Sequence, residues 1–452
     1  MFLPVFRVTV LTLALCAVPH PVGANGRFPM STDVFVKPVD SEVILLSTTF
    51  GLLISSDNGA TFRWICEEAV GYGGVFDPDY AIGADGTIFA GTPDALMISS
   101  DGCAWNPAAG DLAQHWVADI ERGPDGELWV ATSTTARPND VYLSDDNGQI
   151  FAAKNMRSET AFWRSVRVAA SNPQRVYVTG YTQAQSTLDG GVGGPEPLFY
   201  RSDNGGESWM QIDLVGVEFG PQPLFLLHGV DPTDPDVVFA RSVGANGVIG
   251  DFLYRSDNGG TSWAKVLETG TGIRAFVIRK SGDIIVGTVN NDADMDRVFV
   301  STNGGVGFSP AAQQPQMGCI AEDENGRLLA CGANWEPDFF ALGSSSDGVN
   351  WTKLVRFSEM KSAYSCPAET LQASLCESRL WPTLCEQFAC NRGSSNDVDA
   401  GPSGDGSGND GGGCCDAGAG AAGSVILTAA TGLLLLAVLR RRRSKPLEPP
   451  SQ

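Results

Sequence analysis

Histidine is scarce in this chain, and the sequence motifs of common enzyme sites are absent. Three histidines occur among 452 residues. No Gly-x-Ser-x-Gly, His-Glu-x-x-His or phosphate-loop pattern is present, and no Cys-x-x-Cys pair. His20 falls in an expected leader, and we expect His115 and His228 to be structural. No familiar hydrolase, zinc or nucleotide site is therefore indicated, and no catalytic residue is assigned.

Positive charge is also scarce. The chain has 30 Lys and Arg against 52 Asp and Glu, a formal net charge of −22. Five of the positive charges lie between residues 440 and 445, so the remaining chain is still more acidic. An acidic surface repels phosphate backbones, so nucleic acid is not expected as a partner. The hydrophobic fraction of 43% is sufficient for a sizeable core.

Long apolar runs occur only near the two ends. The first follows Arg7 and stops before two prolines, and small residues then precede Asn25, which predicts a secretory signal cleaved after Ala24. The second run, at residues 417–439, is long enough to span a bilayer and is followed by four arginines, so its basic end is expected in the cytoplasm. We therefore expect an exported body with one C-terminal transmembrane helix.

A short motif recurs seven times between these runs. Its consensus is Ser-x-Asp/Asn-x-Gly-x-x-Trp/Phe, and its copies begin at residues 55, 99, 144, 202, 256, 301 and 345. Apolar strand-like residues precede it, the Asp or Asn can accept turn N–H groups, and the Gly can adopt positive φ. The defining positions are Asp57, Gly59, Asp101, Asp146, Gly148, Asn204, Gly206, Trp209, Asn258, Gly260, Trp263, Asn303, Gly305, Asp347 and Trp351.

The spacing of the motif predicts the fold. Intervals of 44 or 45 residues match one four-stranded propeller blade, and a second turn-and-strand signal recurs in phase with the first. Residues 31–360 lack a long stretch of helical periodicity. The prediction is an all-β chain with a single seven-bladed β-propeller. Two longer intervals indicate insertions near residues 183–197 and 244–250, which we expect to form the contact surface.

The motif resembles the Asp-box, or BNR, repeats of sialidases, sortilin-type receptors, exo-xyloglucanases and plastid photosystem assembly factors. The resemblance covers residues 31–360. It implies a propeller with the boxes on the outer rim, and it does not select a function. The Arg-Ile-Pro motif of sialidases is replaced by Arg27-Phe28-Pro29 ahead of the first strand. Exo-xyloglucanases require paired carboxylates, and the acidic candidates, mostly in Asp-Pro turns, are Asp77, Asp79, Asp231 and Asp234.

Eight cysteines remain after the leader and the C-terminal pair are set aside. An even number in an exported chain predicts disulfides. Two fall in the first two blades and two in the last blade. The other four lie in residues 361–390, where we expect two short helices stapled by two disulfides. The eight candidates are Cys66, Cys103, Cys319, Cys331, Cys366, Cys376, Cys385 and Cys390.

The C-terminal region combines a tether with a membrane segment. Residues 391–416 are rich in Gly, Ser and Asp, which predicts a flexible linker. This linker, Cys414, Cys415, the apolar run and the arginines together resemble the C-terminal sorting signal of myxobacterial surface proteins. The resemblance implies cleavage by a sorting peptidase near the two cysteines and retention at the cell surface. The expected segments are residues 1–24, 31–360, 361–390, 391–416, 417–439 and 440–452.

The function predicted from these features is a cell-surface binding or adhesion module for a protein or glycan, without catalysis. The alternatives are a glycoside-active enzyme with an unrecognised carboxylate pair, and a structural envelope protein. Carboxylates gathered at one mouth of the channel would favour the enzyme, and an apolar or aromatic face would favour binding. No cofactor is expected apart from a weak Ca²⁺ candidate at Asp292, Asp294 and Asp296.

Overall fold

The computed structural model describes residues 27–390, except for residues 184–193, 221–223, 245–249 and 293. The described residues belong to one compact unit. The predicted leader, linker, membrane segment, basic tail and cysteine pair Cys414–Cys415 lie outside the described residues, as do most residues of the two long insertions. Within the described ranges, no helix has the length and apolar character needed to cross a membrane.

Seven four-stranded antiparallel meanders make up the fold, as predicted. Blades 1 to 3 consist of β1 (Ser31–Val36), β2 (Ile44–Thr48), β3 (Gly51–Ser55), β4 (Arg63–Ile65); β5 (Asp79–Ile82), β6 (Ile88–Gly91), β7 (Leu96–Ser99), β8 (Asn106–Pro107); and β9 (Val117–Arg122), β10 (Leu128–Thr132), β11 (Val141–Ser144), β12 (Ala152–Ala153). Blades 4 and 5 consist of β13 (Ala161–Ala169), β14 (Asn172–Thr182), β15 (Glu196–Ser202), β16 (Met210–Gln211); and β17 (Phe225–Val230), β18 (Val238–Val243), β19 (Asp251–Ser256), β20 (Ala264–Glu268).

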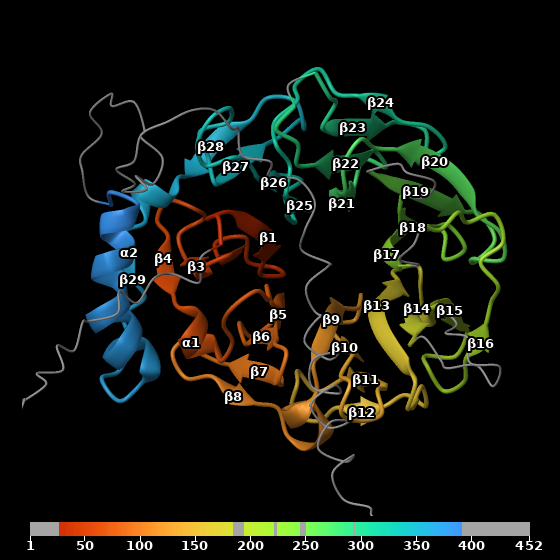
Figure 1. Cartoon of the computed structure of the whole chain (residues 1–452), viewed down its shortest axis with the longest axis horizontal. Coiled ribbons are helices and arrows are strands. Elements are labelled where there is room, and N and C mark those ends of the chain that lie inside the picture. Colours follow the sequence, from red (N-terminus) through yellow and green to blue (C-terminus); the bar gives the residue numbers. More distant parts are fainter. Residues whose placement is uncertain (1–26, 184–193, 221–223, 245–249, 293, 391–452) are drawn as a thin grey trace, which may run out of the picture. The chain divides into compact units, whose positions relative to one another are not determined.

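Blades 6 and 7 complete the ring. They consist of β21 (Ile273–Ile278), β22 (Ile284–Thr288), β23 (Val298–Ser301), β24 (Ser309–Pro310); and β25 (Cys319–Glu322), β26 (Leu328–Cys331), β27 (Leu342–Ser345), β28 (Thr352–Val355). The first strand of each blade lies beside the first strand of the next around the centre, and β25 lies beside β1 (Figure 1). Short helices between strands are α1 (Glu67–Val70), η1 (Gly110–Gln114) and η2 (Phe357–Glu359).

The meander gives the ring two different faces. In each blade the loop between the first and second strands and the loop between the third and fourth strands lie at the same end. The repeated motif forms the second of these loops, so we call this end the repeat-turn face. The other loops, including most of the longer ones, lie at the opposite end, the loop face. The inner strands therefore begin at the loop face.

The repeated turn has the same hydrogen bonds in each blade. In blade 1, the Ser55 hydroxyl accepts the N–H of Gly59 at 2.9 Å and donates to Asp57 Oδ1 at 2.8 Å. Asp57 Oδ1 also accepts the N–H of Thr61 at 2.8 Å. The acidic or amide residue thus holds the turn through backbone N–H groups, as the motif predicts.

The motif glycine also packs against the preceding blade. Gly260 has a φ of +88°, and a Cβ added there would lie 2.0 Å from Phe199 Cε1. The glycine is therefore required by the aromatic ring beside it as well as by its backbone angle. The same juxtaposition occurs for Gly148, Gly206 and Gly305 against Phe89, Trp129 and Phe239.

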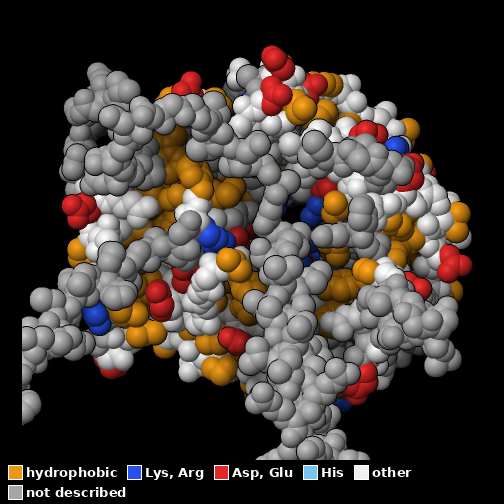
Figure 2. Space-filling model, viewed as in Figure 1, with side chains coloured by type: hydrophobic (Ala, Val, Ile, Leu, Met, Phe, Trp, Pro, Cys, Tyr) orange, Lys and Arg blue, Asp and Glu red, His pale blue; other side chains and the backbone are white. Residues whose placement is uncertain are grey.

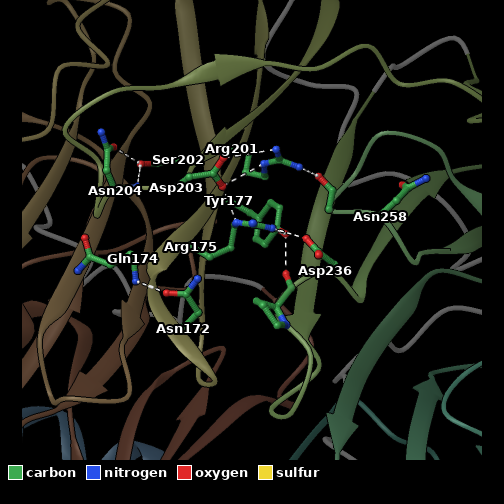
Figure 3. A network of polar contacts seen from close by, with 12 residues as sticks. Asn172, Gln174, Arg175, Tyr177, Arg201, Ser202, Asp203, Asn204, Asp236 and Asn258 are labelled. Carbon is green, nitrogen blue, oxygen red and sulfur yellow. Dashed lines mark hydrogen bonds and ion pairs between the residues drawn. The ribbon is translucent and has the colours of Figure 1, made fainter.

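Polar contacts join blades 4 and 5 on the repeat-turn face (Figure 3). The Arg175 guanidinium lies 2.5 Å from Asp203 Oδ1 in the turn of its own blade and also pairs with Asp236 of blade 5. The Tyr177 hydroxyl donates to the carbonyl of Pro235 at 2.6 Å. These contacts connect blades 4 and 5 at the repeat-turn face.

The C-terminal segment folds back onto blades 1 and 2. The strand β29 (Ser362–Ala363) pairs in parallel with β4, and a helix follows, formed by η3 (Gln372–Leu380) and α2 (Trp381–Gln387). Figure 1 shows this helix outside blade 1. The prediction of two short helices is corrected to one continuous helix of 16 residues, because α2 begins where η3 ends.

The disulfides link this segment to the ring. Cys66 is bonded to Cys376 and Cys103 to Cys366, and the Cys319–Cys331 bond lies within blade 7. The expectation of two disulfides inside the segment was wrong, since two of its cysteines bond to blades 1 and 2. The bonds do support an exported protein.

The remaining two cysteines of the segment lie side by side without a disulfide between them. The N–H of Cys390 donates to the carbonyl of Cys385 at 2.9 Å. Burial raises the pKa of the Cys390 thiol, and a hydrogen bond with Cys385 raises it further. The Cys390 thiol therefore remains protonated at neutral pH.

Candidate ligand-binding site at the channel mouth

Blades 1 to 3 place an aspartate at the same point of their inner strands. Positions in each blade can be counted from the second-strand residue that pairs with the motif serine. In each of these blades, the residue three positions later on the second strand pairs with an aspartate of the first strand. These aspartates are Asp33, Asp79 and Asp119. All three side chains are half-buried. This rung, which we call the mouth rung, lies close to the loop face.

Two of these carboxylates connect neighbouring inner strands. Asp79 Oδ2 accepts the N–H of Ile120 at 2.6 Å, and Asp119 Oδ2 accepts the N–H of Val166 at 2.7 Å. Asp33 differs, because the hydrogen bond of its carboxylate is to the next N–H of its own strand, at 2.7 Å. Asp79 and Asp119 therefore contribute to blade packing, and Asp33 is held less firmly.

An arginine of blade 4 lies among these carboxylates. Arg167 Nη1 is 2.7 Å from Asp119 Oδ2 and 3.7 Å from Glu121 Oε2. Burial nevertheless raises the pKa of Asp33 to about 6 and that of Glu121 to about 7, although Arg167 opposes both shifts. Burial and the neighbouring acids also raise the pKa of Asp79. The channel thus contains carboxyl groups that are partly protonated near neutral pH.

The opposite side of the mouth is basic. A β-bulge at the mouth rung of blade 4 leaves Arg164 outside the ladder, and the equivalent bulge of blade 6 leaves out Arg274. Arg164 lies over the Trp116 ring, 5.0 Å from its centroid. Arg274 is close enough to Asp77 of blade 2 to oppose the rise of that carboxyl's pKa. Figure 2 shows blue and red side chains beside a hollow near the ring centre.

Blade 5 contributes a histidine below these arginines. His228 bulges from β17 two rungs further from the loop face than Arg164. Its ring stacks on Phe276 with centroids 5.2 Å apart. Burial, together with the charges of Arg241 and Arg167, lowers the pKa of His228 well below its usual value. The imidazole is therefore neutral at physiological pH.

Aromatic side chains lie in several loops of the loop face. Phe76 and Trp116, in the loops before β5 and β9, make an edge contact with centroids 5.6 Å apart. Phe28 and Trp335 make a second edge contact, at 5.2 Å. Phe28 is 65% exposed, Phe76 36% and Phe339, in the same loop as Trp335, 48%. Aromatic surface is therefore accessible beside the charged channel.

The Arg27-Phe28-Pro29 string lies at this mouth. Arg27 Nη1 is 2.8 Å from Asp77 Oδ1, and its Nη2 is 3.4 Å from Glu67 Oε1. Burial raises the pKa of Glu67 to about 7 despite the neighbouring arginine. Arg27 and Asp77, two residues considered from the sequence, thus form an ion pair with each other.

The other acidic candidates lie elsewhere. Asp231 and Asp234 are in the turn between β17 and β18, on the repeat-turn face, where Asp231 Oδ1 accepts the N–H of Thr233 at 2.8 Å. Asp231 therefore takes part in a turn. His115 is buried, with its ring nitrogens 2.6 Å and 3.0 Å from the carbonyls of Asp111 and Pro138, so it is structural.

The calcium candidate is not gathered into a site. Asp292 Oδ1 accepts the N–H of Asp294 at 3.0 Å, and the Arg297 guanidinium donates to the carbonyl of Asp292 at 3.2 Å. Across the part of the chain that the structure describes, no three His, Cys, Asp or Glu side chains converge as metal ligands. The described contacts of this loop are turn contacts.

Comparisons with known proteins do not show a family. No family model matches the chain, and no curated protein matches it. Solved structures similar to it include the GH74 xyloglucanase from Xanthomonas campestris (15% identity, TM-score 0.38, 71% of this chain and 57% of that chain). The extracellular domain of BT4673 from B. thetaiotaomicron is another (14%, 0.48, 71% and 39%), and YCF48 from Cyanidioschyzon merolae a third (12%, 0.44, 67% and 92%).

Likenesses this distant carry no argument about activity. The chain spans 57% and 66% of the lengths of two GH74 enzymes that it resembles. The assignment of seven blades depends on the sheet topology of the chain itself. Its function has to be argued from its own residues.

The raised pKa of Asp33 leads to a prediction about stability. Below about pH 4, near the unfolded pKa, the protonated carboxyl contributes its full stability, which is lost as the pH rises through about 6. Asp33→Asn should therefore stabilise the protein by about 1–2 kcal/mol at pH 7.5, after allowance for partial exposure, and by little at pH 4. Urea unfolding at both pH values measures this, and an equal effect at both would contradict the assignment.

Proposed function

We propose that this chain is an exported binding protein that holds a carbohydrate at the loop-face mouth of its channel. The observation that carries the proposal is the exposed aromatic surface beside a polar, charged hollow. Ligand sites combine aromatic walls with a few converging polar groups. Phe76 and Trp116 supply such a wall, and Trp116 packs against Arg164 of the channel.

The chemistry of the mouth suits sugar rings. One face of a sugar presents C–H groups that pack on aromatic rings, and its hydroxyls both donate and accept hydrogen bonds. Asp33 and Glu121 offer acceptors, and Arg164 and Arg274 offer donors, within one channel. Two cavities of about 440 and 450 Å³ on the repeat-turn face have no aromatic residue in their linings. The loop face is therefore the better candidate.

A glycoside-active enzyme is the second candidate, favoured by one observation. Asp33 is half-buried, its pKa is raised to about 6, and no hydrogen bond within the described residues ties its carboxylate to the neighbouring blade. A general acid needs a carboxyl that stays protonated near neutral pH, and Glu121 on the inner strand of blade 3 offers a second carboxyl. Turnover would require these two groups to lie on either side of a scissile bond.

A glycan array tests the proposal with residues 25–402, which contain the described ring. We expect at least one oligosaccharide to bind, and Phe76→Ala and Trp116→Ala each to weaken binding about tenfold, equivalent to about 1.4 kcal/mol. Ile150→Ala, an exposed apolar residue on the repeat-turn face, is the matched control and should change nothing. Absence of binding to every glycan on the array, or binding that the Phe76 and Trp116 variants leave unchanged, would contradict the proposal.

The same array separates the two candidates. Products released from a bound glycan would identify an enzyme, and Asp33→Asn should then abolish release while binding remains. Binding without any released product identifies a carbohydrate-binding module.

A further inference from the structure

We propose that the basic side of the mouth is an anion subsite, in which Arg164 and Arg274 grip a carboxylate or sulfate group of the ligand above His228. The inference rests on the proposed function, since it names the class of carbohydrate: an acidic one. The three residues come from the inner strands of blades 4, 6 and 5.

The strand register places these side chains in the channel. A bulged residue leaves the ladder, and its side chain is redirected. Five inner strands bulge, but blades 1 and 3 have the small residues Thr32 and Ala118 at that point. Among the bulged residues, the large basic side chains therefore occur in blades 4 and 6. The mouth is acidic on one side and basic on the other.

The two arginines lack the partners that other arginines have. Arg167 pairs with Asp119, and Arg241 pairs with Asp251. Within the described ranges, neither Arg164 nor Arg274 takes part in an ion pair, although acidic residues outnumber basic ones in the chain. Arg164 is half-buried, whereas Arg274 is exposed. At Arg164, burial without an ion pair is costly, because the guanidinium loses hydration without compensation. A bound anion would supply that compensation.

Unused hydrogen-bonding atoms point to the same place. Arg164 Nε and His228 Nε2 are buried, and neither has a hydrogen-bond partner among the described residues. Arg164 and His228 come from the inner strands of the neighbouring blades 4 and 5. Arg164 is also fixed by its stacking on Trp116, which leaves its planar edge available. A planar guanidinium edge matches a carboxylate or sulfate through two parallel hydrogen bonds.

The acidic side gives the ligand a direction. Asp33 and Asp79 would repel an anionic group, whereas sugar hydroxyls can donate to them. The acidic group should therefore lie toward blades 4 to 6 and the hydroxyls toward blades 1 and 2. The aromatic pair Phe76 and Trp116 lies in the loops that enter blades 2 and 3, and Trp116 contacts Arg164, so a sugar ring packed on this pair would lie beside both groups.

Histidine NMR tests this subsite without any knowledge of the full ligand. Only His115 and His228 remain after the expected leader is removed, and His115 is already bonded at both ring nitrogens. Residues 25–402 labelled at imidazole Cε1 would be titrated with sodium sulfate and with sodium D-glucuronate at constant ionic strength. We expect a saturable shift of the His228 signal with either anion and no shift of the His115 signal.

Variants decide whether the arginines are responsible. Arg164→Gln and Arg274→Gln should each weaken the response at least tenfold, and Arg379→Gln, an exposed arginine on the C-terminal helix, should leave it unchanged. An unchanged His115 signal shows that a variant is folded. An unmoved His228 signal, or full response in both mouth variants, would overturn the subsite. Response to sulfate alone would restrict it to sulfated ligands.

The two proposals fail separately. A His228 response without any bound oligosaccharide would keep the anion subsite and remove the carbohydrate proposal. Binding of trigalacturonate and its neutral methyl ester with equal affinity, without a His228 response, would keep the carbohydrate proposal and remove the subsite.

Discussion

Replacing Cys66 and Cys103 with serine together lowers the free energy of unfolding by about 5 kcal/mol or more. The two bonds span 310 and 263 residues. A crosslink that closes so long a loop removes more unfolded-state entropy than one that closes a short loop, about 5 kcal/mol for the first bond, with a smaller gain for the second nested within it. Urea unfolding of the oxidised variant and wild type measures the difference.

The disulfide of blade 7 provides the control. Cys319 and Cys331 are only 12 residues apart, so replacing both should cost about 3 kcal/mol at most. If both double variants lose the same free energy of unfolding, the two long disulfides do not stabilise the closed ring more than the local disulfide of blade 7 does. The blade 1 and blade 7 contacts would then suffice without the C-terminal segment.

Gly260→Ala destabilises the protein by about 3–5 kcal/mol. The added Cβ would lie 2.0 Å from the ring of Phe199, and the φ of +88° disfavours any side chain. The steric conflict forces the buried ring or the turn to move, and the backbone cost of about 1–2 kcal/mol adds to it. Thermal and urea unfolding of the purified variant measure the loss.

Gly304→Ala separates the two costs. Gly304 precedes the equivalent glycine of blade 6, has a φ of +70°, and a Cβ there would meet nothing within 4 Å. It should cost only the backbone term, about 1–2 kcal/mol. Equal losses at the two positions would show that contact with the preceding blade is unimportant.

The local parts of the fold could be predicted from the sequence because they depend on neighbouring residues. Ser55, Asp57 and Gly59 complete their turn within one short segment, so the motif is sufficient to predict the hairpin. Seven copies at one spacing then predict seven blades. The disulfide partners of Cys366 and Cys376 could not be predicted, because they lie some 260 to 310 residues away and are brought near only when the ring closes.

The candidate site was mostly missed for a related reason. Asp33 and Asp119 are single acidic residues in apolar strands, and only the cross-strand register shows that they share a rung with Asp79. Asp79 is one of the acidic candidates from the sequence, and its carboxylate connects β5 to β9. The positions of Arg164 and Arg274 depend on β-bulges, which no residue pattern predicts. A charged residue inside an otherwise apolar inner strand was the available signal.

The position of a bound oligosaccharide tests the central claim most directly. A crystal structure of residues 25–402 with the tightest ligand from the array should show a sugar ring on Phe76 and Trp116, with its polar groups in the channel between Asp33 and Arg164. A ligand on the repeat-turn face or on the outer edge of the blades, with the loop face empty, would contradict the proposed site.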